Sequence, residues 1–101
     1  MEKKKPHYLL SEIRRVVERR GVNAFTATAL TGAAALGLSG EQAVFVVLGL
    51  KQKDFYKSMT TNADYRIWQD VYHVTIRSGL VAYVKVTLRE NGAVMIQLKE
   101  L

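Results

Sequence analysis

The sequence predicts an α+β domain in which helices from the first half pack on one face of a small, mostly antiparallel sheet from the second half. Apolar residues before residue 52 recur every three or four positions, which is the spacing of helices that bury one side. After that point they alternate with polar residues, as in strands with one covered face. The 101 residues match the usual length of one domain, so we expect residues 1–101 to fold together.

The first two expected helices lie before residue 38. Apolar positions in 9–17 share one helical face while basic residues take the other, and Gly21 is the expected stop. An alanine-rich segment predicts a second helix over 26–36, although Gly32 lowers its helix propensity.

The third segment, 43–50, is rich in valine and fits either a buried strand or a buried helix. Ser39 and Gln42 precede it with the spacing of a capping box, in which each side chain satisfies a free backbone N–H at a helix start. This pattern favours a helix.

Strands are expected over 65–77, 80–89 and 94–99. Asn91-Gly92 predicts a hairpin with a type I′ turn between the last two. In the first of these strands, alternation separates one set of side chains from another: Ile67, Gln69, Val71 and His73 against Trp68, Asp70, Tyr72, Val74 and Ile76.

The predicted sheet has one apolar face, which packs on the helices, and therefore one open face. The open face carries polar side chains that adjacent strands bring within ~5 Å of one another. They are Tyr83, Lys85, Arg89, Gln97 and Lys99. Such a surface suits contact with RNA, and it equally suits a solvated face that keeps the protein soluble.

Charge and composition limit the function classes. The net charge of +6 and the pI of about 9.8 favour a nucleic-acid partner, but would also attract an acidic protein or a membrane surface. No cysteine is present, and the two histidines lie far apart, so we expect no disulfide scaffold, metal site or cofactor. The longest apolar run, 43–50, has only eight residues and no signal peptide is visible, so we expect a cytoplasmic protein without a membrane partner.

The remaining side chains permit RNA cleavage, because the 2′-hydroxyl of RNA supplies the nucleophile. The protein then needs a proton acceptor, positive charge beside the phosphate, and a proton donor for the 5′-oxygen. Lysine and tyrosine can fill these positions without a metal, leaving a 2′,3′-cyclic phosphate and a 5′-hydroxyl.

The segment KDFYKSMTTNADYRIWQDVY, residues 53–72, closely resembles the signature of the MqsR family of toxin endoribonucleases, as do the opening MEK with Pro6-His7 and the ending Leu98-Lys99-Glu100. The resemblance implies a RelE-like fold and the toxin of a type II toxin–antitoxin pair. Such toxins cut mRNA without the ribosome or a metal, at short GC-containing sequences. They are silenced by a zinc-binding antitoxin whose helix-turn-helix domain represses the operon, so operator DNA is an indirect partner.

The resemblance also assigns site residues. The catalytic candidates that it gives are Lys57, Gln69, Tyr83 and Lys99. To these we add, as substrate-binding candidates, Tyr56, Met59, Lys85, Arg89 and His73. The two catalytic lysines would neutralise the scissile phosphate, and one of them would deliver the leaving-group proton. The tyrosine would transfer a proton or stack on a base, and the glutamine would position the phosphate or contact a base edge. Structural alternatives are a cross-strand aromatic contact for Tyr83, a sheet-face hydrogen bond for Gln69 and a purely structural role for His73.

Alternation through residues 55–59 places Lys57 on one face with Phe55 and Met59, and Tyr56 on the other. Phe55 and Trp68 are interpreted as packing residues. Two rival functions use the same basic face: a nucleic-acid-binding regulator without catalysis, and a module that docks an acidic protein.

Overall fold

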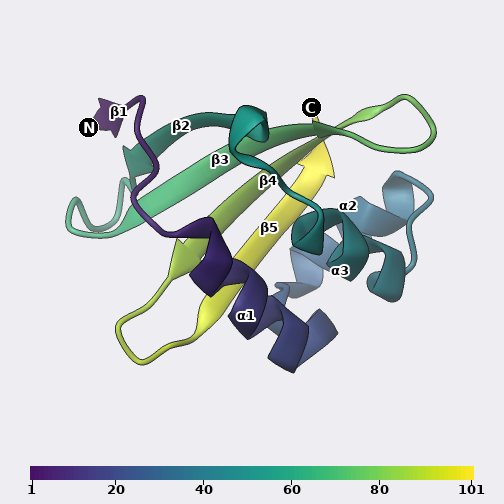
Figure 1. Ribbon diagram of the computed structural model, residues 1–101, viewed down its shortest axis with the longest axis horizontal. Coiled ribbons are helices and arrows are strands. Elements are labelled where there is room, and N and C mark those ends of the chain that lie inside the picture. The colour runs from purple at the N-terminus through teal and green to yellow at the C-terminus, as the bar shows by residue number, and fades with distance from the viewer.

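Helices and strands separate along the chain as the sequence predicts, with one added strand at the N-terminus. The computed structural model describes all of residues 1–101 (Figure 1). Its elements are β1 (Glu2–Lys3), α1 (Leu10–Arg20), the 3-10 turn η1 (Gly21–Ala24), α2 (Ala27–Ala35), α3 (Gly40–Leu48), the 3-10 turn η2 (Gln52–Asp54), β2 (Phe55–Thr60), β3 (Trp68–Thr75), β4 (Val81–Leu88) and β5 (Val94–Glu100).

The helices begin and end for the local reasons that the sequence suggests. Helix α1 stops at Gly21, whose φ of 56° is a left-handed conformation that glycine adopts readily. Thr26 caps α2 by accepting the backbone N–H of Ala29. Ser39 and Gln42 form the expected capping box at α3, which confirms a helix rather than a strand for the valine-rich segment.

Gly32 weakens α2 locally, but it allows the helix to approach the sheet closely. A Cβ atom at this position would lie well inside van der Waals contact of the backbone oxygen of Leu98 and 3.2 Å from the Cα of Lys99. Both atoms belong to β5, which has the most extensive contact of any strand with α2. Glycine here sets the distance between the helix layer and the sheet.

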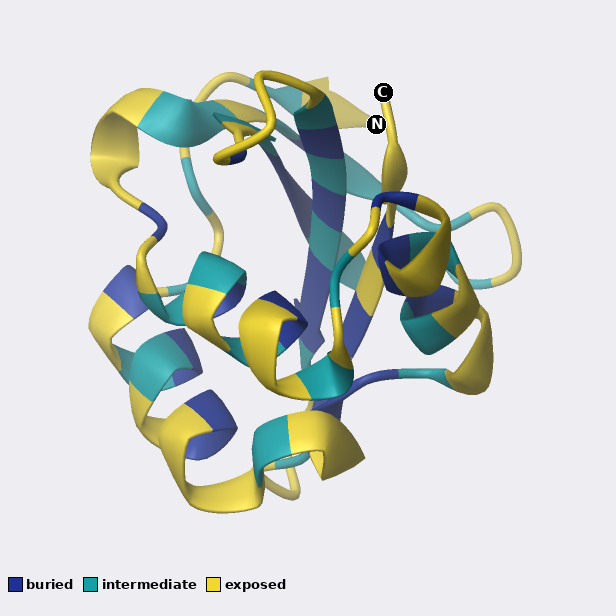
Figure 2. Cartoon of the chain, turned by 90° about the vertical axis from the view of Figure 1, so that its right-hand side faces the viewer, coloured by how far each residue is buried: buried dark blue, intermediate teal, exposed yellow.

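The five strands form one antiparallel sheet in the order β1-β2-β3-β4-β5. Its central covered row joins Tyr72, Val84 and Leu98 across three strands, and all three are buried. Figure 2 shows buried residues alternating with more accessible ones along the strands, while the helices turn their buried stripes inward. The single core therefore lies between the helices and one face of the sheet, and the other face stays open.

The β4–β5 hairpin differs from the predicted turn. The N–H of Gly92 donates to the carbonyl of Arg89 at 2.9 Å, and no residue other than glycine has a positive φ. A type I′ turn needs positive φ at both central residues, so that prediction is wrong. Beyond the Leu88–Val94 pair, the N–H of Arg89 donates to the carbonyl of Ala93 at 2.7 Å. The loop therefore has three residues, 90–92, of which Gly92 alone is left-handed (φ 84°).

The N-terminal segment crosses the covered side of β2 and β3 before α1 begins (Figure 1). Buried Asp70 fastens it: its carboxylate accepts the N–H of His7 (3.0 and 3.1 Å) and of Tyr8 (2.9 Å). The same carboxylate accepts the Ser58 hydroxyl at 2.6 Å. Trp68 stacks on His7 with ring centroids 5.3 Å apart, so it is a packing residue as predicted. These contacts position the N-terminal segment so that β1 pairs with the edge of β2.

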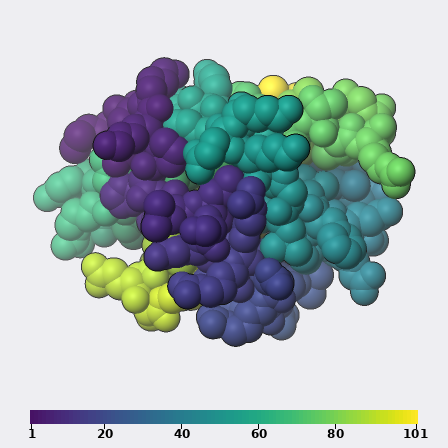
Figure 3. All heavy atoms as spheres, viewed as in Figure 1, coloured from purple at the N-terminus to yellow at the C-terminus, as the bar shows by residue number.

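The space-filling view shows the N-terminal residues, in purple, lying directly against the teal atoms that follow α3 (Figure 3). No single helix is long and apolar enough to cross a membrane. Helices α2 and α3 together pass the length and composition test, but they meet at 95°.

Candidate active site

Three strands bring predicted site residues into one row on the open face. His73 on β3 pairs with Tyr83 on β4, which pairs with Lys99 on β5. The His73 and Tyr83 ring centroids are 5.7 Å apart, and the Lys99 ammonium lies 5.4 Å from the centre of the Tyr83 ring. Sequence alternation predicts the face on which each side chain lies, but not the register between strands. It is this register that aligns the three side chains.

A β-bulge in β2 adds Tyr56 to this row. Phe55 pairs with Tyr72 and Lys57 with Val71, so Tyr56 is the extra residue between them. In such a bulge two successive side chains point to the same face. The predicted alternation is therefore wrong here: Tyr56 and Lys57 share the open face, while Phe55 turns to the core.

The aromatic contacts confirm both orientations. Tyr56 stacks on His73 with centroids 4.2 Å apart and planes within 18°, and Phe55 meets buried Tyr72 edge-on at 5.7 Å. We call Tyr56, His73, Tyr83 and Lys99 the aromatic row, since three rings in succession end at a lysine. Tyr56 is 46% exposed, which leaves much of its side chain accessible to a nucleobase.

Lys57 lies between the aromatic row and the N-terminal strand. Its ammonium is 5.7 Å from the Tyr56 ring and donates a hydrogen bond of 2.9 Å to the Glu2 carboxylate. This bond and the opposite charge raise the pKa of Lys57 and lower the pKa of Glu2. Lys57 is therefore a cation, and Glu2 an anion, at neutral pH.

The phenol of Tyr83 remains protonated at neutral pH. Burial raises its pKa, and the nearby charge of Lys57 offsets only part of that effect. Tyr83 can therefore donate a proton or a hydrogen bond in this site, whereas the phenolate that would accept a proton is disfavoured.

Lys85 adds a third cation beside the aromatic row. It pairs with Val71 on one side and Gln97 on the other, in the next row of the open face. Burial and the charge of Lys99 lower its pKa. A bound phosphate would favour the charged form of Lys85, because an anion offsets the repulsion from Lys99.

Gln69 and Met59 pair with each other one step further along β2 and β3, and thus flank Lys57 rather than join the aromatic row. Both lie on the open face. Diagonal neighbours of this kind are ~7–8 Å apart, within the span of one nucleotide but not of a direct contact. Gln69 therefore lies where it can contact a base or sugar next to the phosphate.

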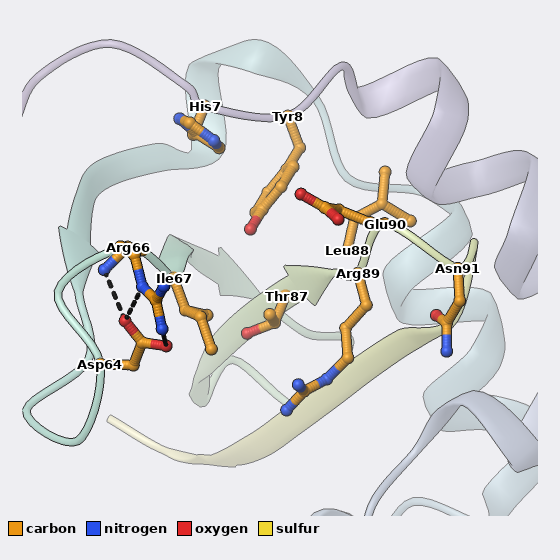
Figure 4. A pocket seen from close by; sticks show the side chains of 10 residues that line it. All are labelled: His7, Tyr8, Asp64, Arg66, Ile67, Thr87, Leu88, Arg89, Glu90 and Asn91. Carbon is orange, nitrogen blue, oxygen red and sulfur yellow. Dashed lines mark hydrogen bonds and ion pairs between the residues drawn. The ribbon is translucent and has the colours of Figure 1, made fainter.

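Arg89 is a predicted site residue that lies away from the aromatic row. It follows β4 and lines a cleft of about 750 Å³ at the far end of the sheet, where its guanidinium is 3.5 Å from the Met95 sulfur. Figure 4 shows Arg89 and Arg66 coming from two different loops toward this cleft. Asp64 binds Arg66 through two side-chain hydrogen bonds of 3.0 and 3.1 Å, so Arg89 is the freer cation of the two.

Sequence reasoning missed Glu2. A two-residue strand has no periodicity, and its position depends on contacts with residues more than fifty positions away. Among the residues that the register places on the open face, Glu2 is the only acid. No group of three or more His, Cys, Asp or Glu side chains converges on a possible metal position.

Comparison with known proteins identifies the family of this chain. The family model described as "Motility quorum-sensing regulator, toxin of MqsA" matches residues 5–100. A curated relative, the mRNA interferase toxin MqsR of Escherichia coli (strain K12), is 41% identical over 100 residues, which cover 99% of each chain. A match over this much of the chain shows that the chain belongs to the MqsR family of toxins.

Proposed function

We propose that this MqsR-family toxin is an mRNA-cutting endoribonuclease that works on the open face of its sheet. The observation that carries the proposal is the placement of Lys57 beside the aromatic row, with two tyrosines, a histidine and three lysines on one surface. Such a surface stacks nucleobases and binds the phosphate between them. The curated relative, similar over nearly its whole length, is named an mRNA interferase.

The reaction follows from the charges of these groups. The 2′-hydroxyl loses its proton to a base and its oxygen attacks the adjacent phosphorus, Lys57 and Lys99 neutralise the charge that builds up on the phosphoryl oxygens, and the 5′-oxygen leaves. Tyr83, held protonated, supplies the proton that the leaving oxygen needs. The products are a 2′,3′-cyclic phosphate and a 5′-hydroxyl. Every step uses the substrate and side chains of this chain, so the reaction proceeds without a metal or a ribosome.

The partners follow from the family. A toxin of this kind has an antitoxin, as the family description states for its members. We further propose that the antitoxin binds zinc, carries a helix-turn-helix domain and links the toxin to operator DNA, and that the toxin cuts cytoplasmic mRNA at short GC-containing sequences. Co-purification with a neighbouring gene product that contains zinc and binds its own promoter would support these points, whereas an antitoxin without zinc would contradict them.

The decisive experiment is incubation of the purified protein with a defined RNA in EDTA, followed by end-group analysis. We expect discrete fragments with 5′-hydroxyl ends, and their loss in Lys57→Ala. Lys53→Ala is the matched control, because Lys53 is an exposed lysine with no hydrogen bond or ion pair. Intact RNA that still binds with a steep salt dependence would instead identify a non-catalytic nucleic-acid-binding regulator.

A further inference from the structure

The N-terminal strand places a carboxylate in the candidate active site. Glu2 pairs with Met59 at the edge of the sheet, on the same face as Lys57. The Lys57 ammonium donates to the Glu2 carboxylate at 2.9 Å, and the Glu2 side chain is 59% exposed. One side of the carboxylate is therefore fixed by the lysine while the rest remains accessible to a substrate.

The strand is short, but it is held on both sides of Glu2. The ammonium of Met1 donates to the Thr60 hydroxyl at 3.0 Å, and the Thr60 N–H donates to the Met1 carbonyl at 2.9 Å. After the strand, Asp70 binds the backbone of His7 and Tyr8. A segment fastened at both ends keeps its side chain in one place, as a group that transfers protons requires.

Neither Lys57 nor Tyr83 is a suitable proton acceptor in this site. Lys57 and Tyr83 both have raised pKa values, so both hold their protons at neutral pH. Glu2 is ionised there, because Lys57, Lys4 and the Met1 ammonium all favour its charged form. A phosphate that hydrogen-bonds to Lys57 also weakens the bond that lowers the pKa of Glu2, so substrate binding makes the carboxylate a stronger base.

In the order of the strands, Lys57 on β2 also lies between Glu2 on β1 and Tyr83 on β4. Attack by the 2′-oxygen and departure of the 5′-oxygen occur on opposite sides of the phosphorus. A phosphate bound at Lys57 thus has a proton acceptor on one side and a proton donor on the other.

We infer that Glu2 is the general base of the cleavage reaction. This inference rests on the proposed endoribonuclease function. Glu2 takes the proton from the 2′-hydroxyl as the bond from the 2′-oxygen to phosphorus forms. The bond from phosphorus to the 5′-oxygen breaks, and that oxygen takes the proton of Tyr83. The Glu2 proton later returns to solvent and Tyr83 is reprotonated, so protons and charge balance over the cycle.

The test compares Glu2→Gln with the parental protein on a defined RNA in EDTA. The glutamine oxygen still accepts a hydrogen bond from Lys57 but is not basic. We expect kcat to fall about 100-fold or more with KM changed less than about threefold, as for loss of a general base. Glu2→Asp should recover part of the rate. Glu41→Gln, which removes one exposed acid from the first turn of α3, is the control and should cut at the parental rate.

A second substrate separates the two proton transfers. An RNA with sulfur in place of the scissile 5′-oxygen needs no acid, because a thiolate leaves readily. On it Tyr83→Phe should regain its rate while Glu2→Gln stays slow. Recovery of Glu2→Gln would place Glu2 at the leaving group and overturn the inference.

Two kinetic results also overturn it. An unchanged kcat with a lower KM would mean that Glu2 only competes with phosphate for Lys57, and an unchanged kcat and KM would leave it no role.

In the pH profile of kcat/KM, the acidic limb should lie below pH 4.5 because Lys57 lowers the pKa of Glu2. A limb near pH ~6.5 would identify a histidine as the base instead. If the parental protein cuts no RNA at all, the proposed function fails rather than the assignment of Glu2.

Discussion

The carboxylate of Asp70 accepts the backbone N–H of Tyr8 at 2.9 Å, across 62 positions of the sequence. Asp70 is fully buried, and its other partners are the His7 N–H and the Ser58 hydroxyl. These contacts give Asp70 a structural role. It binds the N-terminal segment to the sheet and thereby positions Glu2.

Asp70→Asn should loosen this attachment. The amide keeps one acceptor oxygen and puts an N–H₂ group where donors already point, so we expect the free energy of unfolding to fall by about 1–3 kcal/mol. Hydrogen exchange should accelerate at the His7 and Tyr8 amides more than in β4. Asp64→Asn is the control, because Asp64 binds Arg66 on the surface, where loss of an ion pair changes stability little. Unchanged exchange at both amides would contradict the anchoring role.

Gly32→Ala tests the close approach of α2 to β5. Alanine has the higher helix propensity, yet its Cβ would overlap the backbone of Leu98, which cannot move without disturbing the sheet. We expect a loss of about 1–3 kcal/mol, measured as a lower midpoint in urea unfolding. Thr28→Ala, at an exposed position of the same helix, should instead be neutral or slightly stabilising. A gain in stability at both positions would show that the layers can separate freely.

Tyr72 should make the protein sensitive to alkaline pH. Burial raises its pKa to about 12, while an exposed tyrosine ionises near 10. Between these values the unfolded chain releases a proton that the folded chain keeps, so stability falls as pH rises from about 10 to 12, by on the order of 2–3 kcal/mol.

Tyr72→Phe should remove most of this fall. At pH 7 it should change stability by less than ~1 kcal/mol, since the hydroxyl makes no hydrogen bond within the protein. Denaturant midpoints at pH 7, 9.5 and 11 measure both effects. An equal alkaline loss in the variant would assign that loss to other groups.

Tyr56→Ala should weaken RNA binding while leaving the chemistry intact. Loss of one base-stacking ring costs about 1–3 kcal/mol, so KM, or the Kd for 2′-O-methylated RNA, should rise about 5- to 150-fold. Tyr56→Phe should bind nearly as the parent does, because the ring is retained. Tyr65→Ala removes another exposed tyrosine, far from the aromatic row, and should bind normally. A fall in kcat alone would point to proton transfer rather than stacking.

Arg89→Gln tests whether RNA continues from the active site to the cleft. If a phosphate binds there, affinity for a long RNA should drop and the slope of log K against log salt should decrease by about 0.7, the value for one single-strand contact. Arg20→Gln makes the same charge change at the end of α1 and should leave the slope unchanged. Equal effects of both variants would mean that only net charge matters.

Local patterns in the sequence were enough to predict much of this protein. The helix spacing, the capping box of Ser39 and Gln42, and the alternation that puts Tyr83, Lys85 and Lys99 on one face are all confirmed. Each depends on residues within a few positions of one another, and periodicity records such relationships directly. The resemblance in residues 53–72 likewise predicted the family that the comparisons show.

The tertiary structure decided the features that depend on distant partners. The bulge that turns Tyr56 toward His73 arises from the register between β2 and β3, and the hairpin loop arises from the pairing of β4 with β5. Glu2 meets Lys57 only because Asp70 and Thr60 hold the N-terminal segment at the sheet edge. Such contacts join residues far apart in the chain, and no local pattern encodes them. They stabilise the protein only once the whole sheet has formed.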